Sequence, residues 1–367
     1  MAQGECCCVI WTGLCDHQNG RYAPSGLGIQ RANAPAREAM TRGTLMFETN
    51  MAGHVRPHDL LGVAHPVPWA RELIFRAIPG GGIAMVHRHN DTINHAAIRW
   101  TGDGRAHTLR VTYAWDTSKD WARLALEQPE RAQVVSNTVH APNPLLAQDM
   151  RDLMLGRGAH TLSREVLFAA ISPDIFPIGP TPSLHPATPI ATPNGYRPAE
   201  TLRRGDTVMT AVGDIVPVLH TVRQSVPARG SFRPVRLQAP YFGLARDIVV
   251  SPEQRLVLRG SDVEYIFGQE AVLVPARHMV NGHAAIWAAP QTTADYVQIL
   301  LPGHEALVAA GCALESLYIG RLRRNERDLS ASILADMPSR LLPEHAKPIH
   351  QVLRQFEAIT LVEQRAA

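Results

Sequence analysis

The sequence predicts a mainly β protein of two domains, and three observations lead to this prediction. The chain has 367 residues, which is more than one ordinary hydrophobic core holds. Short apolar runs, several with a period of two, recur along it and are separated by turn-forming residues. A proline-rich stretch, residues 172–182, divides these runs into two groups. We therefore expect an N-terminal β-sandwich, a linker, a second all-β domain and a short helical tail.

The first part of the chain is expected to pass from an irregular lead into the sandwich. Residues 1–40 show little periodicity, whereas residues 41–171 contain several strand-like runs. In the clearest run, residues 108–115, apolar side chains alternate with polar ones, so one face would be apolar and one wet. Short strands at this spacing are typical of a sandwich. One helix is also predicted, with Asn143 as its cap and Gly156 at its end.

The second part begins with the proline-rich residues 172–182, SPDIFPIGPTP. Proline fixes its own backbone angle and restricts the residue before it, so this segment is predicted to be a stiff, extended linker. Residues 183–320 return to short β runs that few charges interrupt, and residues 321–367 form the helical extension. Its two predicted helices cover residues 329–337 and 349–363.

The composition limits the classes of function. An apolar share of 45% and a charged share of 19% are those of a globular protein. Lys and Arg outnumber Asp and Glu by only 36 to 33, so neither nucleic acid nor a membrane surface is expected as a partner. No apolar run is long enough to span a bilayer, and the N-terminus lacks the pattern of a secretory signal. A cytoplasmic location is expected, and export without the Sec system stays open.

The cysteines do not indicate a cofactor. Cys6, Cys7, Cys8 and Cys15 lie near the N-terminus, and Cys312 is isolated far downstream. Adjacent thiols rarely converge on one tetrahedral metal site, and no Cys/His pair follows at the spacing of a zinc finger. We therefore expect no metal there, no other cofactor, no disulfide framework and a reducing compartment.

Ordered motifs between residues 183 and 320 carry a resemblance to a known family. Residues 183–210 hold a Thr-x-Ile-x-Thr-Pro-x-Gly segment, then an acidic residue, then a Gly-Asp-x-Val-x-Thr segment. Further matching segments are residues 247–252, 272–276 and 304–316. Together these motifs resemble bacterial Hint domains, which are relatives of inteins and of the hedgehog autoprocessing domain. The resemblance implies a horseshoe-shaped, all-β Hint-like domain over residues 183–320.

The resemblance also implies a chemistry. In the family, a nucleophile at the first position attacks the carbonyl carbon of the preceding residue, and a histidine in a Thr/Ser-Pro-x-His motif protonates the departing nitrogen. The matching positions are Ser183 for the nucleophile, Ser251 and Gln254 in the second motif, and His304 in a His-Glu pair. Self-cleavage would break the Pro182–Ser183 bond by an N-to-O acyl shift.

Two departures from the family pattern favour an inactive domain. Serine at position 183 is far less ionised than cysteine near neutral pH, and Gln254 stands where the family has its proton-transferring histidine. Losing such an acid or base costs about a hundredfold to ten-thousandfold in rate. His185 and His304 stay open as substitutes. If the chain is an enzyme at all, intramolecular autoproteolysis is the activity to expect.

Three hypotheses for the function follow. The first is a Hint-domain protein without efficient autoprocessing that acts as a structural or interaction module. The second is a self-cleaving protein that uses Ser183. The third is a ligand- or carbohydrate-binding β-sandwich with an appended Hint domain. The partner of the N-terminal domain is unknown, and a protein or a carbohydrate is the expected class. Trp100, Trp115 and Trp121 are possible stacking faces, although core packing is the commoner use of tryptophan.

A histidine cluster is a weak candidate metal site. His87, His89 and His95 stand with Asp91 in the run HRHNDTINH. The first two would share one face of a strand, and a turn could return the third beside them. Such a trio would suit zinc or copper. The favoured interpretation is a polar strand edge with a hairpin turn at Asn90, because the spacing of a helical metal motif is absent.

Overall fold

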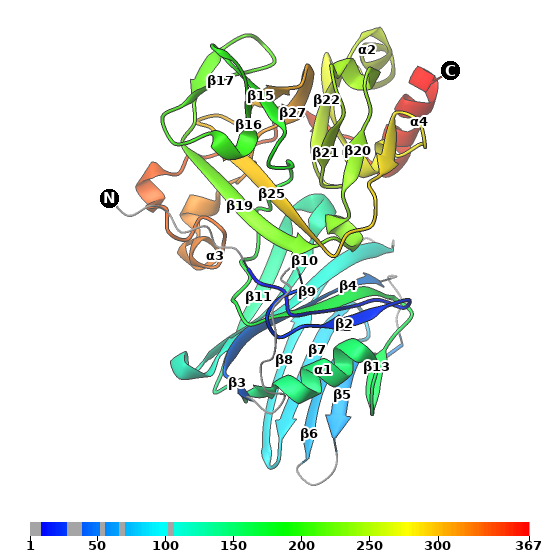
Figure 1. Cartoon of the computed structure of the whole chain (residues 1–367), viewed down its shortest axis with the longest axis vertical. Helices are drawn as coiled ribbons and strands as arrows, with labels where there is room; N and C mark the ends of the chain where they lie inside the picture. Colours follow the sequence, from blue (N-terminus) through cyan, green and yellow to red (C-terminus); the bar gives the residue numbers. More distant parts are fainter. Residues whose placement is uncertain (1–8, 28–38, 52–55, 66–69, 102–105, 367) are drawn as a thin grey trace. The chain divides into compact units, whose positions relative to one another are not determined.

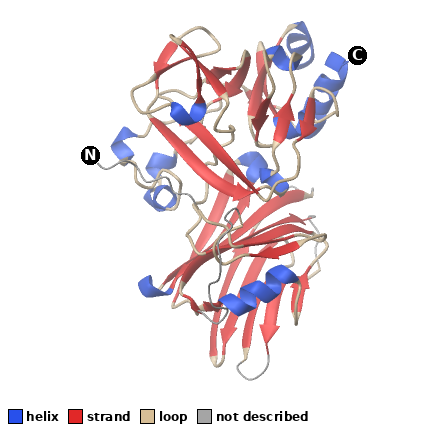
Figure 2. Cartoon of the chain, in the orientation of Figure 1, coloured by secondary structure: helices blue, strands red, loops and turns tan. Residues whose placement is uncertain are grey.

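The computed structural model describes residues 9–27, 39–51, 56–65, 70–101 and 106–366 (Figure 1). They form two compact units, the first over Val9–Gly179 and the second from Pro180 to the C-terminal end. Both units are built mainly from strands, which confirms the predicted fold class (Figure 2). Within the described residues, no helix is long and apolar enough to cross a membrane.

The first unit is a sandwich of two antiparallel sheets. The larger sheet contains, in spatial order, β11 (Gln133–His140), β10 (Trp121–Gln128), β9 (His107–Asp116), β4 (Arg42–Met51), β14 (Val166–Ser172), β1 (Gly13–Cys15) and β2 (Gly20–Tyr22). The smaller sheet contains β13 (His160–Leu162), β5 (His58–His65), β6 (Arg71–Ala77), β7 (Gly82–His89) and β8 (Thr92–Arg99). A short pair, β3 (Ala39–Met40) with β12 (Leu145–Leu146), and the helix α1 (Ala147–Leu155) complete the unit.

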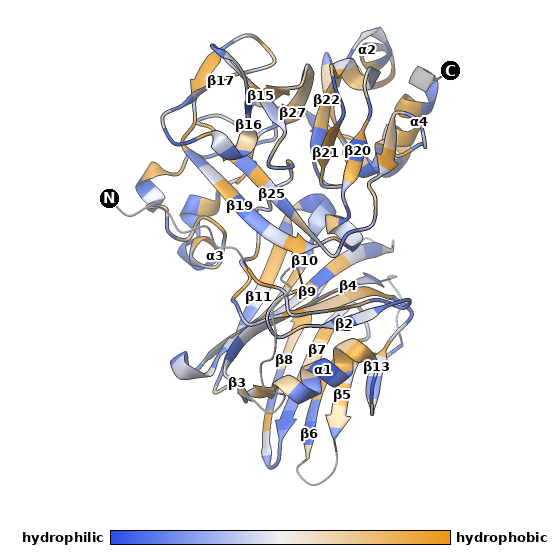
Figure 3. Cartoon of the chain, in the orientation of Figure 1, coloured by the Kyte–Doolittle hydropathy of each residue, from blue (hydrophilic) through white to orange (hydrophobic). Residues whose placement is uncertain are grey.

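Aromatic side chains from both sheets fill the core of the sandwich. The rings of Phe47 on β4 and Phe75 on β6 lie 5.2 Å apart between centroids, and Tyr113 on β9 lies 6.2 Å from Phe75. All three side chains are fully buried. Hydrophobic and hydrophilic residues alternate along many strands in Figure 3, as a sandwich requires. The predicted N-terminal β-sandwich is thereby confirmed.

Two strands lie in the lead that the sequence predicted to be irregular. β1 and β2 belong to the larger sheet, where Gly13 of β1 is opposite Ile171 of β14 and Tyr22 of β2. Each of these strands has three residues, which is too short to show a period in the sequence. Tertiary pairing therefore decides their structure, and the prediction of an irregular segment is wrong for these residues.

The helix α1 starts later than predicted. It begins at Ala147, and Asn143 does not cap it. The Asn143 side-chain amide instead donates to the main-chain oxygens of His87 and Thr92, at 3.3 and 3.4 Å. The predicted end is right, because Gly156 closes the helix with a φ of 64°, a left-handed conformation that glycine adopts without strain.

Strand β9 is buried on both faces, so its predicted wet face is wrong. Arg110, on that face, is 3% exposed. Its guanidinium donates to Glu48 at 3.0 Å and lies 3.9 Å from Glu127 on the other neighbouring strand. Two cross-strand carboxylates thus compensate the buried cation, an arrangement that the alternation of one strand cannot reveal.

Part of the proline-rich segment packs on the first unit. Phe176 and Ile178 are 2% and 3% exposed, and the ring of Phe176 lies 5.5 Å from that of Trp11. The main-chain N–H of Phe176 donates to the Thr44 hydroxyl at 2.8 Å. The prediction of an unpacked linker is therefore wrong for residues 172–179. Proline restricts the local backbone, but it does not keep the apolar residues between prolines out of a core.

The second unit is built from several small sheets. The largest contains, in spatial order, β16 (Gly195–Pro198), β15 (Pro189–Thr192), β26 (Ala306–Ala309), β27 (Cys312–Glu315), β22 (Arg255–Arg259), β23 (Ala271–Pro275) and β28 (Gln351–Val352). The others pair β17 (Thr207–Met209) with β18 (Ile215–Pro217), pair β19 (His220–Pro227) with β25 (Thr293–Leu300), and place β20 (Val235–Leu237) between β21 (Ile248–Val250) and β24 (Ala285–Trp287). Its helices are α2 (Ser261–Phe267), α3 (Glu326–Ser330) and α4 (Gln355–Ala366).

The C-terminal segment is an integral part of the second unit rather than a separate helical extension. Strand β28 pairs in parallel with β23, and Ala358 and Leu361 of α4 are fully buried in the main core. The predicted helix at 349–363 is therefore divided into a strand and a helix. The predicted helix at 329–337 is also wrong in extent, because α3 ends at Ser330 and turns follow.

Candidate functional site

The strands around Ser183 fix its position. The next residue, Leu184, forms β-bridges to both Val250 on β21 and Val297 on β25. Leu184 N donates to Val297 O at 3.0 Å, and Ser251 N donates to Ser183 O at 2.7 Å. Ser183 is 7% exposed. The main chain therefore holds the Ser183 side chain inside the unit, next to the end of β21.

Gln254 faces Ser183 from the turn that follows β21. Within this turn Gln254 N donates to Ser251 O at 3.1 Å, so Ser251 takes part through its main chain. The Ser183 hydroxyl donates to Gln254 Oε1 at 2.5 Å. The Gln254 amide nitrogen donates to the main-chain oxygens of Arg255 and Glu315, at 2.9 and 3.2 Å. The structure thus brings together the side chains of Ser183 and Gln254, two of the positions that the resemblance singled out.

A third side chain, Gln298 on β25, completes the site and was missed by the sequence reasoning. Its amide nitrogen lies 3.0 Å from Ser183 Oγ, 3.0 Å from Gln254 Oε1 and 3.2 Å from Glu315 O. Gln298 is 3% exposed. One signal in the sequence could have revealed Gln298: it is a single amide within the apolar run at residues 296–301. A buried polar side chain usually has a polar partner, so an amide at this position indicates a buried polar contact.

The chemistry of this amide–hydroxyl cluster, Ser183 with Gln254 and Gln298, is that of neutral groups. The serine hydroxyl donates to one amide oxygen and accepts from the other amide nitrogen. Neither amide gains or loses a proton in the ordinary pH range. Within the part of the chain that the structure describes, these two side chains are the ones that hydrogen-bond the Ser183 hydroxyl.

His304 belongs to a neighbouring polar cluster and does not reach Ser183. Its Nδ1 accepts a hydrogen bond from Ile349 N at 2.9 Å, so the ring proton is on Nε2. That nitrogen lies 3.0 Å from Glu315 Oε1, but without the alignment of a hydrogen bond. Arg255 lies 3.0 Å from the same oxygen. Among the described residues, no hydrogen bond joins His304 to the amide–hydroxyl cluster, so His304 does not serve as its acid or base in this structure.

His185, the other substitute considered, points into its own loop. Its side chain is exposed, and its Nδ1 accepts a hydrogen bond from Ala187 N at 3.2 Å. Ser183, two residues away, is buried and bonded to the two glutamines. The structure therefore does not place His185 as a base for the hydroxyl.

The histidines of the weak metal candidate do not converge. Strand register pairs His87 with Asn94 and Val86 with His95. Residues directly opposite on antiparallel strands point to the same side, so His95 lies on the face away from His87 and His89. The zinc or copper interpretation is therefore wrong, because an offset of one residue reverses the face. Over the described residues, no group of three or more His, Cys, Asp or Glu side chains is placed to hold a metal.

The tryptophans are used mainly in packing. Trp115 is fully buried, and its indole N–H donates to the main-chain oxygen of Met40 at 2.7 Å. Trp100 is 9% exposed. Trp121 is half-buried and lies under the Arg123 guanidinium, whose carbon is 5.5 Å from the ring centroid. A stacking role is therefore wrong for Trp115 and Trp100 and stays a hypothesis for Trp121.

The cysteines within the described residues are free and buried. Burial raises the pKa of both Cys15 and Cys312 to about 12, so they stay protonated and unreactive near neutral pH. Cys6, Cys7 and Cys8 lie outside the described residues.

Residues 182–321 match the model of a protein family described as the Hint domain. The second unit contains a Hint domain. This match confirms the predicted Hint-like fold, and it extends one residue beyond each end of the range 183–320 that the motifs indicated. No curated protein matches the chain.

Solved structures are similar to parts of the chain. A CBM40 domain of the IT-sialidase of Ruminococcus gnavus, bound to alpha2,6 sialyllactose, has 15% identity and a TM-score of 0.27 over 37% of this chain and 78% of its own. The MchDnaB-1 intein has 16% identity and a TM-score of 0.25 over 36% of this chain and 98% of its own. The gp41-1 intein has 14% identity and a TM-score of 0.25 over 37% and 98%.

Proposed function

We propose that this Hint domain lacks efficient autoprocessing and serves as a structural or interaction module. One observation carries the proposal: the Ser183 hydroxyl donates a hydrogen bond to the amide oxygen of Gln254. At the family's nucleophile position this chain has a buried hydroxyl that is hydrogen-bonded to a group unable to remove the proton.

The acyl shift needs two proton movements that this site does not support. Ser183 Oγ would have to lose its proton while attacking the Pro182 carbonyl carbon, and the Ser183 nitrogen would have to gain one as the amide bond breaks. Gln254 and Gln298 can orient the hydroxyl, but neither carries a proton between these atoms. The missing acid or base alone accounts for a loss of about a hundredfold to ten-thousandfold in rate.

A second observation concerns the carbonyl group of Pro182, which the nucleophile would attack. Acyl transfer depends on donors placed where negative charge develops on the carbonyl oxygen. Of the residues that the structure describes, none donates a hydrogen bond to Pro182 O. The nearby Ser251 N–H is directed instead at the carbonyl oxygen of Ser183 itself.

The same hydrogen bonds suit a structural role. The amide–hydroxyl cluster joins the segment at Ser183, the turn after β21 and strand β25, and its amides also bond the end of β27 through Glu315 O. A satisfied buried network of this kind fixes one arrangement of the strands it connects. In this proposal the family's reactive centre has become part of the core that holds the module together.

Intact mass spectrometry of the purified chain tests the proposal. We expect a single species of full mass over days, with or without hydroxylamine or thiol, and the same result for Ser183→Ala. A fragment ending at Pro182 that disappears in Ser183→Ala would instead establish the self-cleaving alternative. A double variant, Ser183→Cys with Gln254→His, restores the two family side chains and makes the test more sensitive. The matched control is Ser332→Cys with Gln254→His, which changes a buried serine elsewhere in the unit.

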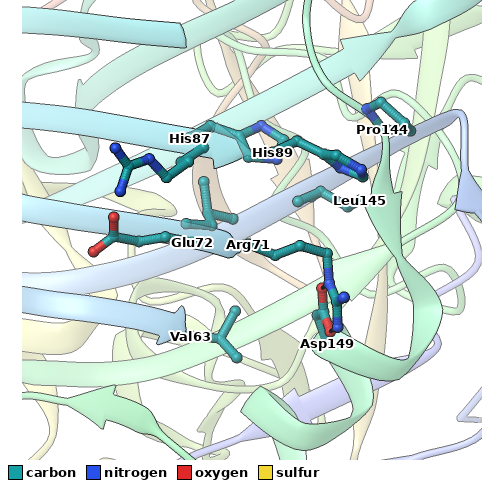
Figure 4. Close-up of a pocket in the computed structure, with 10 residues that line it drawn as sticks. Val63, Arg71, Glu72, His87, His89, Pro144, Leu145 and Asp149 are labelled. Atoms are coloured by element: carbon teal, nitrogen blue, oxygen red, sulfur yellow. Dashed lines mark hydrogen bonds and ion pairs between the residues drawn. The ribbon is translucent and has the colours of Figure 1, made fainter. Parts of the chain in front are cut away.

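The third hypothesis is a ligand-binding sandwich. Trp100 and Trp115 do not support it, because both are buried. The first unit does contain a small pocket (Figure 4). The pocket does not involve the Hint domain, so both functions can exist in one chain.

A further inference from the structure

Three Asn-Gly dipeptides occur in the chain, at Asn19-Gly20, Asn194-Gly195 and Asn281-Gly282, and all three asparagines are exposed. We propose that Asn281 is a site of spontaneous deamidation, and that the fold selects it over the other two. The product is an aspartyl or isoaspartyl residue at position 281. The proposal is independent of the chemistry at Ser183, because this modification leaves the main chain uncleaved.

The loop before β24 directs several main-chain N–H groups at the Asn281 side chain. Asn281 Oδ1 accepts hydrogen bonds from the N–H of His283 at 3.0 Å and of Ala284 at 2.8 Å, and a longer one from Ala285 at 3.5 Å. Because a main-chain N–H is only a donor, the atom on which they converge is the carboxamide oxygen. These contacts hold the carboxamide on the C-terminal side of its own residue, next to the Gly282 peptide.

This arrangement suits attack on the side-chain carbon by the Gly282 nitrogen. The nitrogen loses its proton to hydroxide and forms a bond to Asn281 Cγ, which closes a five-membered ring. Negative charge then develops on Oδ1, where the N–H groups of His283 and Ala284 already point, as donors do at the oxyanion in acyl transfer. The covalent link between the two reacting groups makes the step intramolecular.

Ammonia and a cyclic imide are the first products, and water supplies the remaining atoms. The Cγ–Nδ2 bond breaks, and Nδ2 takes a proton from water and leaves as ammonia. One water molecule then hydrolyses the imide at either carbonyl carbon, and no atom is oxidised or reduced. The leaving nitrogen is open to solvent, because Asn281 is exposed and no hydrogen bond from the described residues holds Nδ2. The net change replaces a neutral amide with a carboxylate.

Gly282 leaves the attacking nitrogen unobstructed. It is exposed and has a φ of 85°, and a Cβ built on it would have no heavy atom within 4 Å beyond its chain neighbours. The main chain is also outside a sheet at this point, because β24 begins only at Ala285. The Gly282 N–H makes one main-chain hydrogen bond, to Ala285 O at 3.2 Å.

The other two asparagines lack the donors that Asn281 has. Asn19 and Asn194 lie in tight turns, and the glycines that follow them are already paired in the strands β2 and β16. In the part of the chain that the structure describes, no N–H group donates to the side-chain oxygen of Asn19 or Asn194. The dipeptide is therefore the same at the three sites, whereas the surroundings of the carboxamide differ.

Peptide mapping of the full-length chain tests the proposal. Samples kept at mildly alkaline pH over days are digested, and mass spectrometry with chromatography resolves the amide, aspartyl and isoaspartyl peptides. In the folded chain we expect Asn281 to deamidate about tenfold faster than Asn19 and Asn194. In denaturant, where the three dipeptides lose their surroundings, the rates should converge. A rate at Asn281 no higher than at the other two sites, or a difference that persists in denaturant, would overturn the proposal.

Two matched glycine variants test the attacking atom. Gly282→Ala places a methyl group beside the nitrogen and should slow the reaction at Asn281 about tenfold. Gly195→Ala should leave the rate at Asn281 unchanged. Both glycines have a positive φ and open surroundings, so the two changes introduce similar backbone strain. An unchanged rate in Gly282→Ala would overturn the proposal, and if this variant does not fold, the comparison of the parent chain with and without denaturant decides.

Discussion

At the scale of single residues, the proposal that the Hint domain lacks autoprocessing depends most on position 254. The sequence motif placed Gln254 opposite Ser183, and the structure brings the two side chains into a hydrogen bond. Gln298 had no such motif. It lies 115 positions from Ser183 along the chain, and only the pairing of strands brings it close. The local sequence therefore indicates that a site exists, but it does not identify every side chain that completes the site.

Removing Gln298 tests the structural role of the amide–hydroxyl cluster. Gln298→Ala leaves Ser183, Gln254 and the main-chain oxygen of Glu315 without a shared donor. We expect the free energy of unfolding to fall by about 1–3 kcal/mol, measured by denaturant titration. The control is Gln269→Ala, at an exposed position, which should change stability by less than about 0.5 kcal/mol. Equal stabilities of the two variants would contradict the role.

The buried His87 also predicts a pH dependence. Its pKa is about 4 in the folded chain and near the ordinary 6.5 when unfolded, so between these values the unfolded state binds the proton more readily. Stability is therefore lost as pH falls from 6.5 toward 4, by about 1.4 kcal/mol for each unit of pKa difference.

Unfolding free energies of the parent chain and His87→Phe, measured across this pH window, check the prediction. The variant should lose less stability on acidification, and His95→Phe should follow the parent. A parent-like pH slope in His87→Phe would show that another group is responsible.

At the scale of elements, the C-terminal helix illustrates what pattern alone leaves open. Helical periodicity was visible near residues 349–363, but it did not show that the segment lies in the core of the Hint-containing unit. Leu361→Ala removes a fully buried side chain and should lower the free energy of unfolding by about 2–4 kcal/mol. Phe356→Ala, at a site 59% exposed, is the control and should be nearly neutral. Chemical denaturation followed by circular dichroism compares the two, and similar losses would refute the assignment.

At the scale of the whole molecule, the border between the units lies inside the proline-rich segment, residues 172–182, but the first part of that segment belongs to the sandwich. The first unit ends at Gly179, three residues before the Pro182–Ser183 bond that self-cleavage would break. A fragment of residues 9–179 should therefore fold, whereas one ending at 171 should have a lower Tm, by roughly 5–10 °C. The shorter fragment lacks Phe176, which is 2% exposed. Differential scanning calorimetry of both fragments measures the effect, and equal Tm values would show that the packed segment adds no stability.

The sequence by itself determined the mainly β character, the two-part organisation and the Hint domain, because alternation, turn residues and ordered motifs are local properties. It also led to the hypothesis that Gln254 stands where the resembled family has its histidine. Only the tertiary structure decided which polar residues meet. It brought Gln298 to Ser183, separated His95 from His87 by one step of register, and packed Phe176 into the sandwich. Each of these outcomes depends on contacts between distant segments, and strand pairing sets such contacts without leaving a periodic signal in either strand.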